Sequence, residues 1–321
     1  MSLVSIIVPC RNYGALLPEA LASVLAQTHA EWECLVVDDG STDSTPAVAA
    51  HYAARDPRIR YLGRPHAGAS AARNHGLREA RGQFVQFLDA DDLLPPRKLE
   101  AQLAYLAAHP TVDVVYGDVR YFRHGEPAVL SRSFDMQDTT AWFVPLHGTG
   151  AAVLRPLLVE NRVVIHAPLL RRSVFEAVGA FSERLGAVED WEFWLRCAAG
   201  GQVFDYQDLP GTQTLVRVHS RSTSQDRARV VANVERLRVH LKPLLAAFGD
   251  AGLLALNQTL LNDIRLENAA YYMQHGEVGR GLLGFTRLAL DTGQFIAGVR
   301  NVAYWLRYSL RKAIKKNNKS L

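Results

Sequence analysis

Short apolar runs alternate with segments of helical periodicity over the first 120 residues of the chain. Residues 4–9 (VSIIVP) form a continuous run rich in β-branched side chains, which predicts a buried strand. From Leu16 the apolar residues recur at intervals of three and four, which predicts a helix. Further strands are predicted at 33–41, 58–62, 83–89 and 112–118, and further helices from about residue 44 and over 70–80. Strands separated by helices predict crossover connections and a mostly parallel sheet.

The pattern changes twice in the rest of the chain. Residues 119–165 lose the alternation and predict loops with short strands. Helices are predicted over 172–181 and 188–201, and a strand over 212–220. After about residue 225 the pattern is purely helical, with turns near residues 248–250 and Gly276. The sequence therefore predicts an α/β domain over residues 1–224 and a helical region over residues 225–321.

Acidic residues gather where two of the predicted strands end. Asp38 and Asp39 follow the second strand, and Asp89, Asp91 and Asp92 follow the fourth. Ligands of parallel sheets bind beyond the carboxyl ends of the strands. Two aspartates one residue apart can hold a hard divalent cation, with substrate phosphates and water completing its shell. Solvated turns use aspartate as well, so a polar loop stays open as the alternative at this point.

Other familiar sites are missing from the sequence. It contains no GxGxxG after the first strand, no phosphate-binding GxxxxGK[ST] loop, no GxSxG elbow and no HExxH. Cys10, Cys34 and Cys197 have no metal spacing. Cys10 and Cys34 lie beside apolar strands and are predicted to be buried, and the cysteine content favours a reducing compartment. No signal segment and no apolar run long enough to span a bilayer stands out, so we expect a cytoplasmic protein.

Charge is distributed unevenly along the chain. Residues 1–220 carry 20 Lys and Arg against 25 Asp and Glu, whereas residues 221–321 carry 16 against 7. Residues 300–321 hold seven basic and no acidic side chains, interleaved with aromatic ones. Such a tail suits the surface of an anionic membrane, which would make the protein peripheral on the inner face of the cell membrane. The alternative is a helix packed on the α/β domain with a solvated basic end. No nucleic-acid-binding motif accompanies the charge, so nucleic acid is not an expected partner.

Five segments in a fixed order resemble glycosyltransferase family 2. They are residues 4–45 (VSIIVPCRNYGALLPEALASVLAQTHAEWECLVVDDGSTDST), 68–77 (GASAARNHGL), 82–100 (GQFVQFLDADDLLPPRKLE), 188–196 (VEDWEFWLR) and 217–224 (RVHSRSTS). The resemblance covers about two thirds of the chain. It implies a GT-A fold, that is, a Rossmann-like α/β domain with a mostly parallel sheet, here followed by a helical C-terminal region. It also implies an inverting, nucleotide-sugar-dependent and usually metal-dependent transferase.

The resemblance gives roles to the residues at the strand ends. Those expected to bind the nucleotide sugar are Pro9, Arg11, Asn12, Asp38, Asp39, Arg73, Asp89 and His219. Within this set, Asp39 would accept a hydrogen bond from the base, and Arg73 would reach the nucleotide or its phosphates. Mn²⁺ or Mg²⁺ would be held by Asp91 first, with Asp89 and His219 as further ligands. The chain departs from many relatives at Cys10 and His66, which puts the preference for base and sugar in doubt.

The pair Glu189-Asp190 matches the catalytic pair of the family, in which the aspartate is the base. The physics agrees, because Asp190 would lie in the first turn of a helix, whose positive end stabilises an ionised carboxylate. A helix cap needs the same residue type, so spacing alone does not separate the two roles.

The resemblance implies transfer of a sugar to an acceptor hydroxyl, with a UDP-sugar as the expected donor. The acceptor would be a glycan or a lipid-linked sugar, in bacterial-type synthesis of surface polysaccharide or other glycans. Two alternatives stay open: a non-catalytic subunit that binds nucleotide sugars or a protein partner, and a sugar nucleotidyltransferase.

Overall fold

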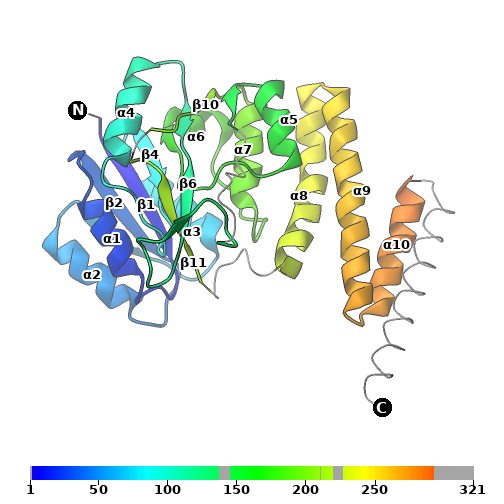
Figure 1. The fold of residues 1–321 in the computed structure, drawn as a ribbon, viewed down its shortest axis with the longest axis horizontal. Coiled ribbons are helices and arrows are strands. Elements are labelled where there is room, and N and C mark those ends of the chain that lie inside the picture. Colours follow the sequence, from blue (N-terminus) through cyan, green and yellow to red (C-terminus); the bar gives the residue numbers. More distant parts are fainter. Residues whose placement is uncertain (1, 137–144, 210, 220–226, 293–321) are drawn as a thin grey trace, which may run out of the picture. The chain divides into compact units, whose positions relative to one another are not determined.

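The computed structural model describes residues 2–136, 145–209, 211–219 and 227–292. The chain forms two compact units, residues 1–225 and 226–321. Figure 1 shows the first as a mixed α/β fold and the second as a set of helices. None of the helices in the described ranges is both long and apolar enough to cross a membrane. The basic tail beyond residue 300 lies outside the described residues.

A large sheet runs through the first unit. Its strands lie in the order β3 (Ile59–Gly63), β2 (Trp32–Asp38), β1 (Val4–Cys10), β4 (Phe84–Phe87), β9 (Leu169–Arg171), β5 (Val114–Tyr116), β10 (Phe204–Tyr206) and β8 (His147–Gly148). The first four of these are parallel to one another, and β9 runs antiparallel between β4 and β5. The prediction of a mostly parallel sheet is confirmed, with an antiparallel strand that the sequence pattern did not predict.

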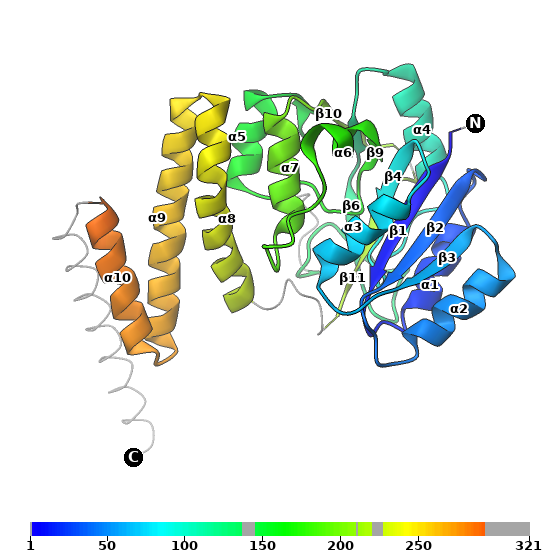
Figure 2. The ribbon, with the colours of Figure 1, turned by 180° about the vertical axis from the view of Figure 1, so that it is seen from behind.

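Helices α1 (Leu17–Leu25), α2 (Thr45–Arg55) and α3 (Ala69–Glu79) cover the two faces of the parallel strands. The other helices of this unit are α4 (Lys98–Ala108), α5 (Ala151–Val159), α6 (Ser173–Val178) and α7 (Glu189–Ala199). Figure 2 shows α3 on the face of β1–β3 opposite to α1 and α2. Successive residues of β1 point to opposite faces. Ile6 and Val8 belong to the core cluster with α1, whereas Ile7 lies against α3, where a Cβ on Gly76 would meet its side chain. Both faces of β1 are therefore buried, as its continuous apolar run predicts.

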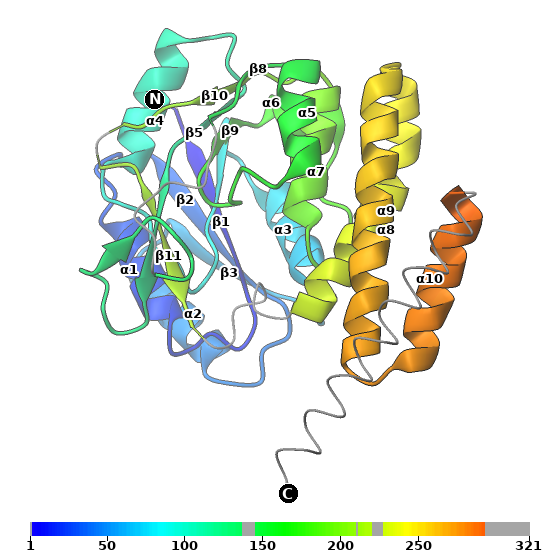
Figure 3. The same cartoon turned by 45° about the vertical axis from the view of Figure 1, so that its right-hand side comes forward.

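The segment over residues 119–165 contains more structure than the loops and short strands predicted for it. Strands β6 (Val119–Arg123), β7 (Leu130–Ser131) and β11 (Thr214–Val218) form a small second sheet. Helix α5 was not predicted, because Gly148 and Gly150 precede it and Pro156 lies within it. Gly150 precedes the helix with a positive φ of 61°, and Pro156 is accommodated inside it. Helix α5 lies beside α7 (Figure 3), and this neighbour shapes the site described below.

The second unit consists of α8 (Arg227–Phe248), α9 (Ala251–Gln274) and α10 (Val278–Thr292). The turns predicted around residues 248–250 and at Gly276 are both present. Asp250 caps α9 by accepting hydrogen bonds from the backbone N–H groups of Gly252 and Leu253, at 2.8 and 3.1 Å. Helix α10 packs tightly on α9, because a Cβ on Gly281 would lie 2.4 Å from the Met273 side chain.

Candidate active site

Three adjacent parallel strands end at one edge of the large sheet. In the pairing register, Cys10 at the end of β1 lies opposite Asp38 at the end of β2, and Ile7 lies opposite Phe87 at the end of β4. The chain therefore carries the acidic residues that follow β2 and β4 to the same edge. This is the edge at which parallel α/β sheets bind their ligands.

Asp38 and Asn12 hold the turn that follows β2. Asp38 accepts hydrogen bonds from the Ser41 backbone N–H and from the Tyr61 hydroxyl, both at 2.9 Å. Asn12 adopts a left-handed conformation, with φ of 59°, which asparagine tolerates well. Its side-chain oxygen accepts from the Thr42 backbone N–H at 2.8 Å. The turn-capping role that aspartate commonly has is thus present at Asp38, whatever it does toward a nucleotide.

Asp39 is 3% exposed and is bound to the loop after β3. It accepts hydrogen bonds from the backbone N–H groups of Ala67 and Gly68, at 3.0 and 2.7 Å. Its second oxygen also lies 2.6 Å from Nδ1 of His66. His66, at which this chain departs from many relatives of the resembled family, therefore sits directly on the predicted base-binding carboxylate. Of the other residues predicted nearby, Pro9 is buried within β1 and Arg11 is exposed.

The turn after β4 brings two predicted ligands together. The isolated pairing of Leu93 with Leu215 places β11 beside this turn. His219 follows β11, and its Nε2 lies 2.8 Å from Oδ2 of Asp91. Arg217 secures the arrangement, because its backbone N–H donates to Asp92 at 2.6 Å and its Nε donates to the Asp91 carbonyl at 2.7 Å. Residues some 128 positions apart in sequence thus share one small volume.

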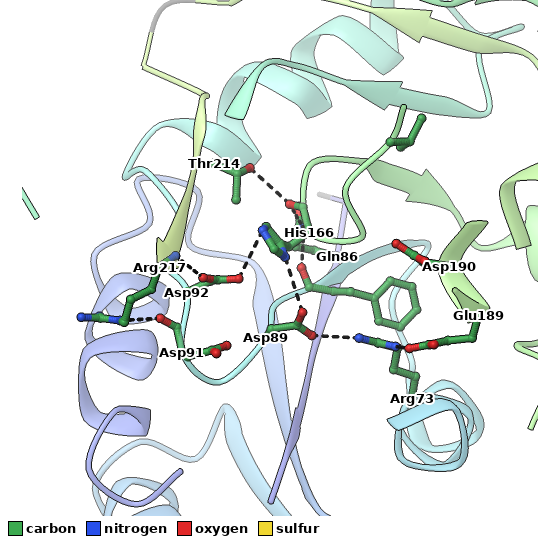
Figure 4. A network of polar contacts seen from close by, with 12 residues as sticks. Arg73, Gln86, Asp89, Asp91, Asp92, His166, Glu189, Asp190, Thr214 and Arg217 are labelled. Carbon is green, nitrogen blue, oxygen red and sulfur yellow. Dashed lines mark hydrogen bonds and ion pairs between the residues drawn. The ribbon is translucent and has the colours of Figure 1, made fainter. Parts of the chain in front are cut away.

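His166 is a member of this site that the sequence analysis missed (Figure 4). It is 2% exposed and stands between two carboxylates, with Nδ1 3.8 Å from Asp89 and Nε2 3.3 Å from Asp92. Burial acts to lower the pKa of His166, but Asp92 and Asp89 outweigh it, so the pKa lies above its ordinary value. Nothing in the local sequence marks His166, since it lies in a segment without strand or helix periodicity.

Buried donors hold the backbone of this histidine in place. Gln86 donates to the His166 carbonyl at 2.9 Å. The next carbonyl, that of Ala167, accepts from Nζ of Lys98 at 2.5 Å and from Gln102 at 3.1 Å. Burial lowers the pKa of Lys98 to about 7. Burying an amine costs free energy unless it is hydrogen-bonded. The bond from Lys98 to the Ala167 carbonyl therefore holds both groups in place and fixes the segment that carries His166.

The donor set is suited to a hard divalent cation. Asp89, Asp92 and His166 can bring one ligand atom each within 4.8 Å of one another. Asp91 and His219 form a second pair at the same turn. Among the residues that the structure describes, neither ring nitrogen of His166 has a hydrogen-bond partner, although both nitrogens are buried. Carboxylate ligands together with substrate phosphate suit Mg²⁺ and Mn²⁺, and an imidazole can add a nitrogen ligand.

Arg73 links the two halves of the site. It comes from α3, and its side chain is 6% exposed. One guanidinium nitrogen donates to Asp89 at 2.9 Å, and the other donates to Glu189 at 2.6 Å. Burial acts to raise the pKa of Asp89, but the Arg73 charge and His166 hold it well below its ordinary value. Arg73 thus joins the turn after β4 to the first residue of α7 (Figure 4).

Asp190 is the second residue of α7. Its Oδ1 accepts from the Trp191 backbone N–H at 2.7 Å, and its Oδ2 accepts from Nδ2 of Asn161 at 3.1 Å. Burial and the neighbouring charge of Glu189 raise the pKa of Asp190 to about 6. A carboxylate with this pKa is ionised near neutral pH and is a stronger base than an ordinary aspartate, which is the property that general base catalysis requires.

The backbone just before this pair is strained. The N-cap of α7 is Val188, which adopts the left-handed conformation with φ of 66° and makes no side-chain capping bond. A β-branched residue is rarely found there, and the conformation costs about 1–3 kcal/mol. Such strain persists where the surrounding structure fixes a functional geometry, and here it sets the direction in which Glu189 and Asp190 leave the helix end.

Comparisons with known proteins agree with this picture. The family model for glycosyl transferase family 2 matches residues 5–179. A glycosyltransferase of PGL/p-HBAD biosynthesis from Mycobacterium bovis is 32% identical over 195 residues, which are 60% of this chain and 68% of that protein. The chain spans only 17–20% of the length of three other curated relatives, two of which are named as uncharacterized glycosyltransferases.

Solved structures share the fold. TarS from S. aureus in complex with UDP-GlcNAc is 18% identical, with a TM-score of 0.62 over 98% of this chain and 92% of that chain. The mannosyltransferase PcManGT from Pyrobaculum calidifontis, in complex with GDP-Man and Mn²⁺, is 22% identical, with a TM-score of 0.54 over 97% and 86% of the two chains. The predicted GT-A fold with a helical C-terminal region is therefore confirmed.

Proposed function

This chain belongs to glycosyl transferase family 2, and we propose that it moves a sugar from a nucleoside-diphosphate sugar to an acceptor hydroxyl with inversion at the anomeric carbon. The observation that carries the proposal is the arrangement at the sheet edge. Asp89 and Asp91 lie on one side of Arg73, and Asp190, with its raised pKa, lies beyond Glu189 on the other. Such a site contains a binding site for a diphosphate and, separately, a general base for a nucleophile.

In the proposed reaction Asp190 removes the proton of the acceptor hydroxyl. The acceptor oxygen forms a bond to the anomeric carbon from the face opposite to the nucleotide. The bond from that carbon to the diphosphate oxygen breaks, and nucleoside diphosphate leaves with the electron pair. The base is ionised when the pH exceeds its pKa of about 6, so the fold supplies an active base at neutral pH.

We propose that Mn²⁺ or Mg²⁺ is bound at the turn after β4. Asp91 and His219 would hold it, with Asp89 as a further ligand. Asp89 can also bring a ligand atom within 4.8 Å of His166 and Asp92, so these two side chains are a second set of ligands that shares Asp89. The cation would neutralise the charge that develops on the leaving diphosphate. Arg217 keeps this turn in place through its hydrogen bonds to Asp92 and to the Asp91 carbonyl.

The proposed donor is a UDP-sugar, bound along the ends of β1 and β2 by Pro9, Arg11, Asn12, Asp38 and Asp39. UDP-GlcNAc binding by TarS supports this class, while GDP-Man binding by PcManGT keeps a purine nucleotide as the alternative. The proposed acceptor is a glycan or a lipid-linked sugar, in the synthesis of surface polysaccharide or related glycans. The biosynthetic role in the name of the mycobacterial relative supports a glycan-building context.

We also propose that the second unit contacts the anionic inner face of the cell membrane from the cytoplasm. Helix α10 buries Phe285 and Ala289, yet it exposes Leu283 and Leu290 at 70% and 69%. The segment that follows α10 is strongly basic, which suits anionic lipid. Co-sedimentation with anionic but not neutral liposomes would support this contact, and equal sedimentation with both would contradict it.

One experiment separates the proposed activity from its alternatives. The protein is incubated with a panel of nucleoside-diphosphate sugars and Mn²⁺, after thermal shift has selected the donors that bind. Release of nucleoside diphosphate in the presence of acceptor indicates glycosyl transfer. Pyrophosphate turnover would instead identify a nucleotidyltransferase, and binding without any product would identify a non-catalytic subunit.

A further inference from the structure

We propose that Asn161 is a positioning residue for Asp190, because its side-chain amide fixes the orientation of the carboxylate that takes the acceptor proton. The proposal rests on the function proposed above. Asn161 lies just after α5, 29 positions before Asp190 in sequence. Its Nδ2 donates to Oδ2 of Asp190 at 3.1 Å, while the Trp191 backbone N–H holds Oδ1 at 2.7 Å.

The two donors leave the carboxylate oriented and still able to act. Each oxygen of an ionised carboxylate can accept two hydrogen bonds. One bond to each oxygen fixes the plane of the group against rotation, and the remaining lone pairs can accept a proton from a substrate hydroxyl. Asn161 is itself fixed, because its Oδ1 accepts from the Val163 backbone N–H at 3.3 Å. With that oxygen engaged, the amide nitrogen is the atom that faces Asp190.

The loop that carries Asn161 is fastened to α7 on both sides of that residue. The Trp191 indole donates to the Leu157 carbonyl at 2.6 Å, and the Trp194 indole donates to the Val163 carbonyl at 2.8 Å. Trp191 is 8% exposed and Trp194 is fully buried. Two large buried side chains of the helix that carries the base therefore hold the segment that carries its partner. They act as part of the framework here and not as platforms for a sugar ring.

The groups around Asp190 raise or lower its pKa, and the Asn161 amide has a specific role among them. Burial and Glu189 raise the pKa of Asp190, whereas Arg73, the Trp191 N–H and the Asn161 amide act against that rise. The charges in the Asn161 loop face each other, since Arg162 lies 3.7 Å from Glu160. Asn161 is thus the side-chain hydrogen-bond donor that stabilises the ionised base without adding a charge to the site.

The test compares the pH dependence of kcat in three full-length variants with that of the wild type. Asn161→Ala removes the donor, and we expect the acid limb of kcat to move upward by about one pH unit. Asn161→Asp keeps the oxygen that accepts from Val163 but places a second carboxylate near the base, so the limb should move further. Val159→Ala, at the last residue of α5 and 47% exposed, changes no charge and should leave the profile unchanged. The KM for the donor should be the same in all of them.

Carboxyl ¹³C NMR gives a second measurement that does not depend on turnover. The Asp190 resonance is assigned by its loss in Asp190→Asn, and its pKa is measured in the wild type and in Asn161→Ala. An unchanged pKa and an unchanged acid limb in a folded Asn161→Ala protein would overturn the proposal. A change confined to the KM for the acceptor would also overturn it and make Asn161 a substrate contact. If the wild type transfers no sugar while the Asp190 pKa still shifts, the proposed function fails and the contact stands.

Discussion

Replacing Asp190 with Asn should lower activity and raise stability at the same time. The neutral side chain cannot accept the acceptor proton, so kcat should fall by roughly 10²–10⁴, the usual worth of general base catalysis. The KM for the donor should stay nearly unchanged, because the predicted donor contacts lie on the other side of Arg73. The stability gain follows from the environment that raises the pKa of Asp190 from 3.8 to about 6.

The size of that gain can be worked out from the pKa. A rise of about two units corresponds to about 3 kcal/mol against the ionised form. The carboxylate is only partly buried in the free protein, so solvent screens part of this effect. The ionised form of Asp190 should then destabilise the folded state by about 1–3 kcal/mol. Because the folded pKa lies above the unfolded one, the folded state loses stability as the pH rises from about 4 to about 6. In Asp190→Asn one of the two accepting oxygens becomes an amide nitrogen, which loses one hydrogen bond at a cost of about 1 kcal/mol at every pH. The variant should therefore be less stable than the wild type by about that amount at pH 4, and should gain about 1–3 kcal/mol on the wild type as the pH rises to 6.

Glu189 provides a matched control, because its substitution should change the stability of the fold in the opposite direction. It is the neighbouring carboxylate, but it pairs with the buried Arg73 at 2.6 Å. Glu189→Gln removes that partner and should destabilise the fold by about 3 kcal/mol at pH 7. Urea unfolding at pH 4, 6 and 8 measures all three proteins. If the stability of Asp190→Asn relative to the wild type does not rise between pH 4 and pH 8, burial does not raise the pKa of Asp190. If kcat survives, Asp190 is a helix-end residue and not the base.

Three further changes test other parts of the site. Asp91→Asn should abolish transfer and nucleoside-diphosphate binding without unfolding the protein, and full activity in excess chelator would exclude the metal. Arg73→Met should destabilise the protein by about 3–5 kcal/mol in urea unfolding, because it leaves two carboxylates without their buried partner. Arg58 is the control: its side chain is 40% exposed, so Arg58→Met should change stability by less than about 1 kcal/mol. Deleting residues 300–321 should release the protein from anionic liposomes, and binding of the intact chain should weaken sharply with salt; no loss on deletion would assign the tail to packing.

Local periodicity predicted the elements that are long and regular. The strand ending at Cys10 and the helix beginning near Leu16 are visible from neighbouring residues alone, because their apolar spacing repeats within one element. The three-residue strand β9 is too short to show a period, and its antiparallel place between β4 and β5 depends on pairings distant in sequence. Helix α5 has Val153, Leu154, Leu157 and Leu158 at helical spacing, but the glycines before it and Pro156 within it favour a loop.

The site residues also divide into those that the local sequence predicts and those that only the folded chain reveals. Asp89 and Asp91 were found because they follow a strand, and parallel topology carries strand ends together. Their partner His166 and the Asp190 partner Asn161 lie in a segment without period, so only the folded chain reveals them. Arg73 was assigned to phosphates by resemblance, and its observed partners are the carboxylates of two other predicted site residues.

The position of Arg73 depends on how closely α3 approaches the sheet, and a single glycine sets that distance. A Cβ on Gly76 would lie 2.5 Å from Ile7 and 3.2 Å from Val37, which is too close for unaltered packing. Gly76→Ala should therefore push α3 outward, destabilise the fold by about 1–3 kcal/mol, and weaken donor binding by moving Arg73. Gly279→Ala is the matched control, since in the described part of the chain no atom lies within 4 Å of a Cβ built on this α10 residue, and the change should be neutral or slightly stabilising. Calorimetric donor titration and thermal melting measure both variants. Destabilised Gly76→Ala protein that binds the donor with wild-type affinity would show that donor binding does not depend on the distance of α3 and Arg73 from the sheet.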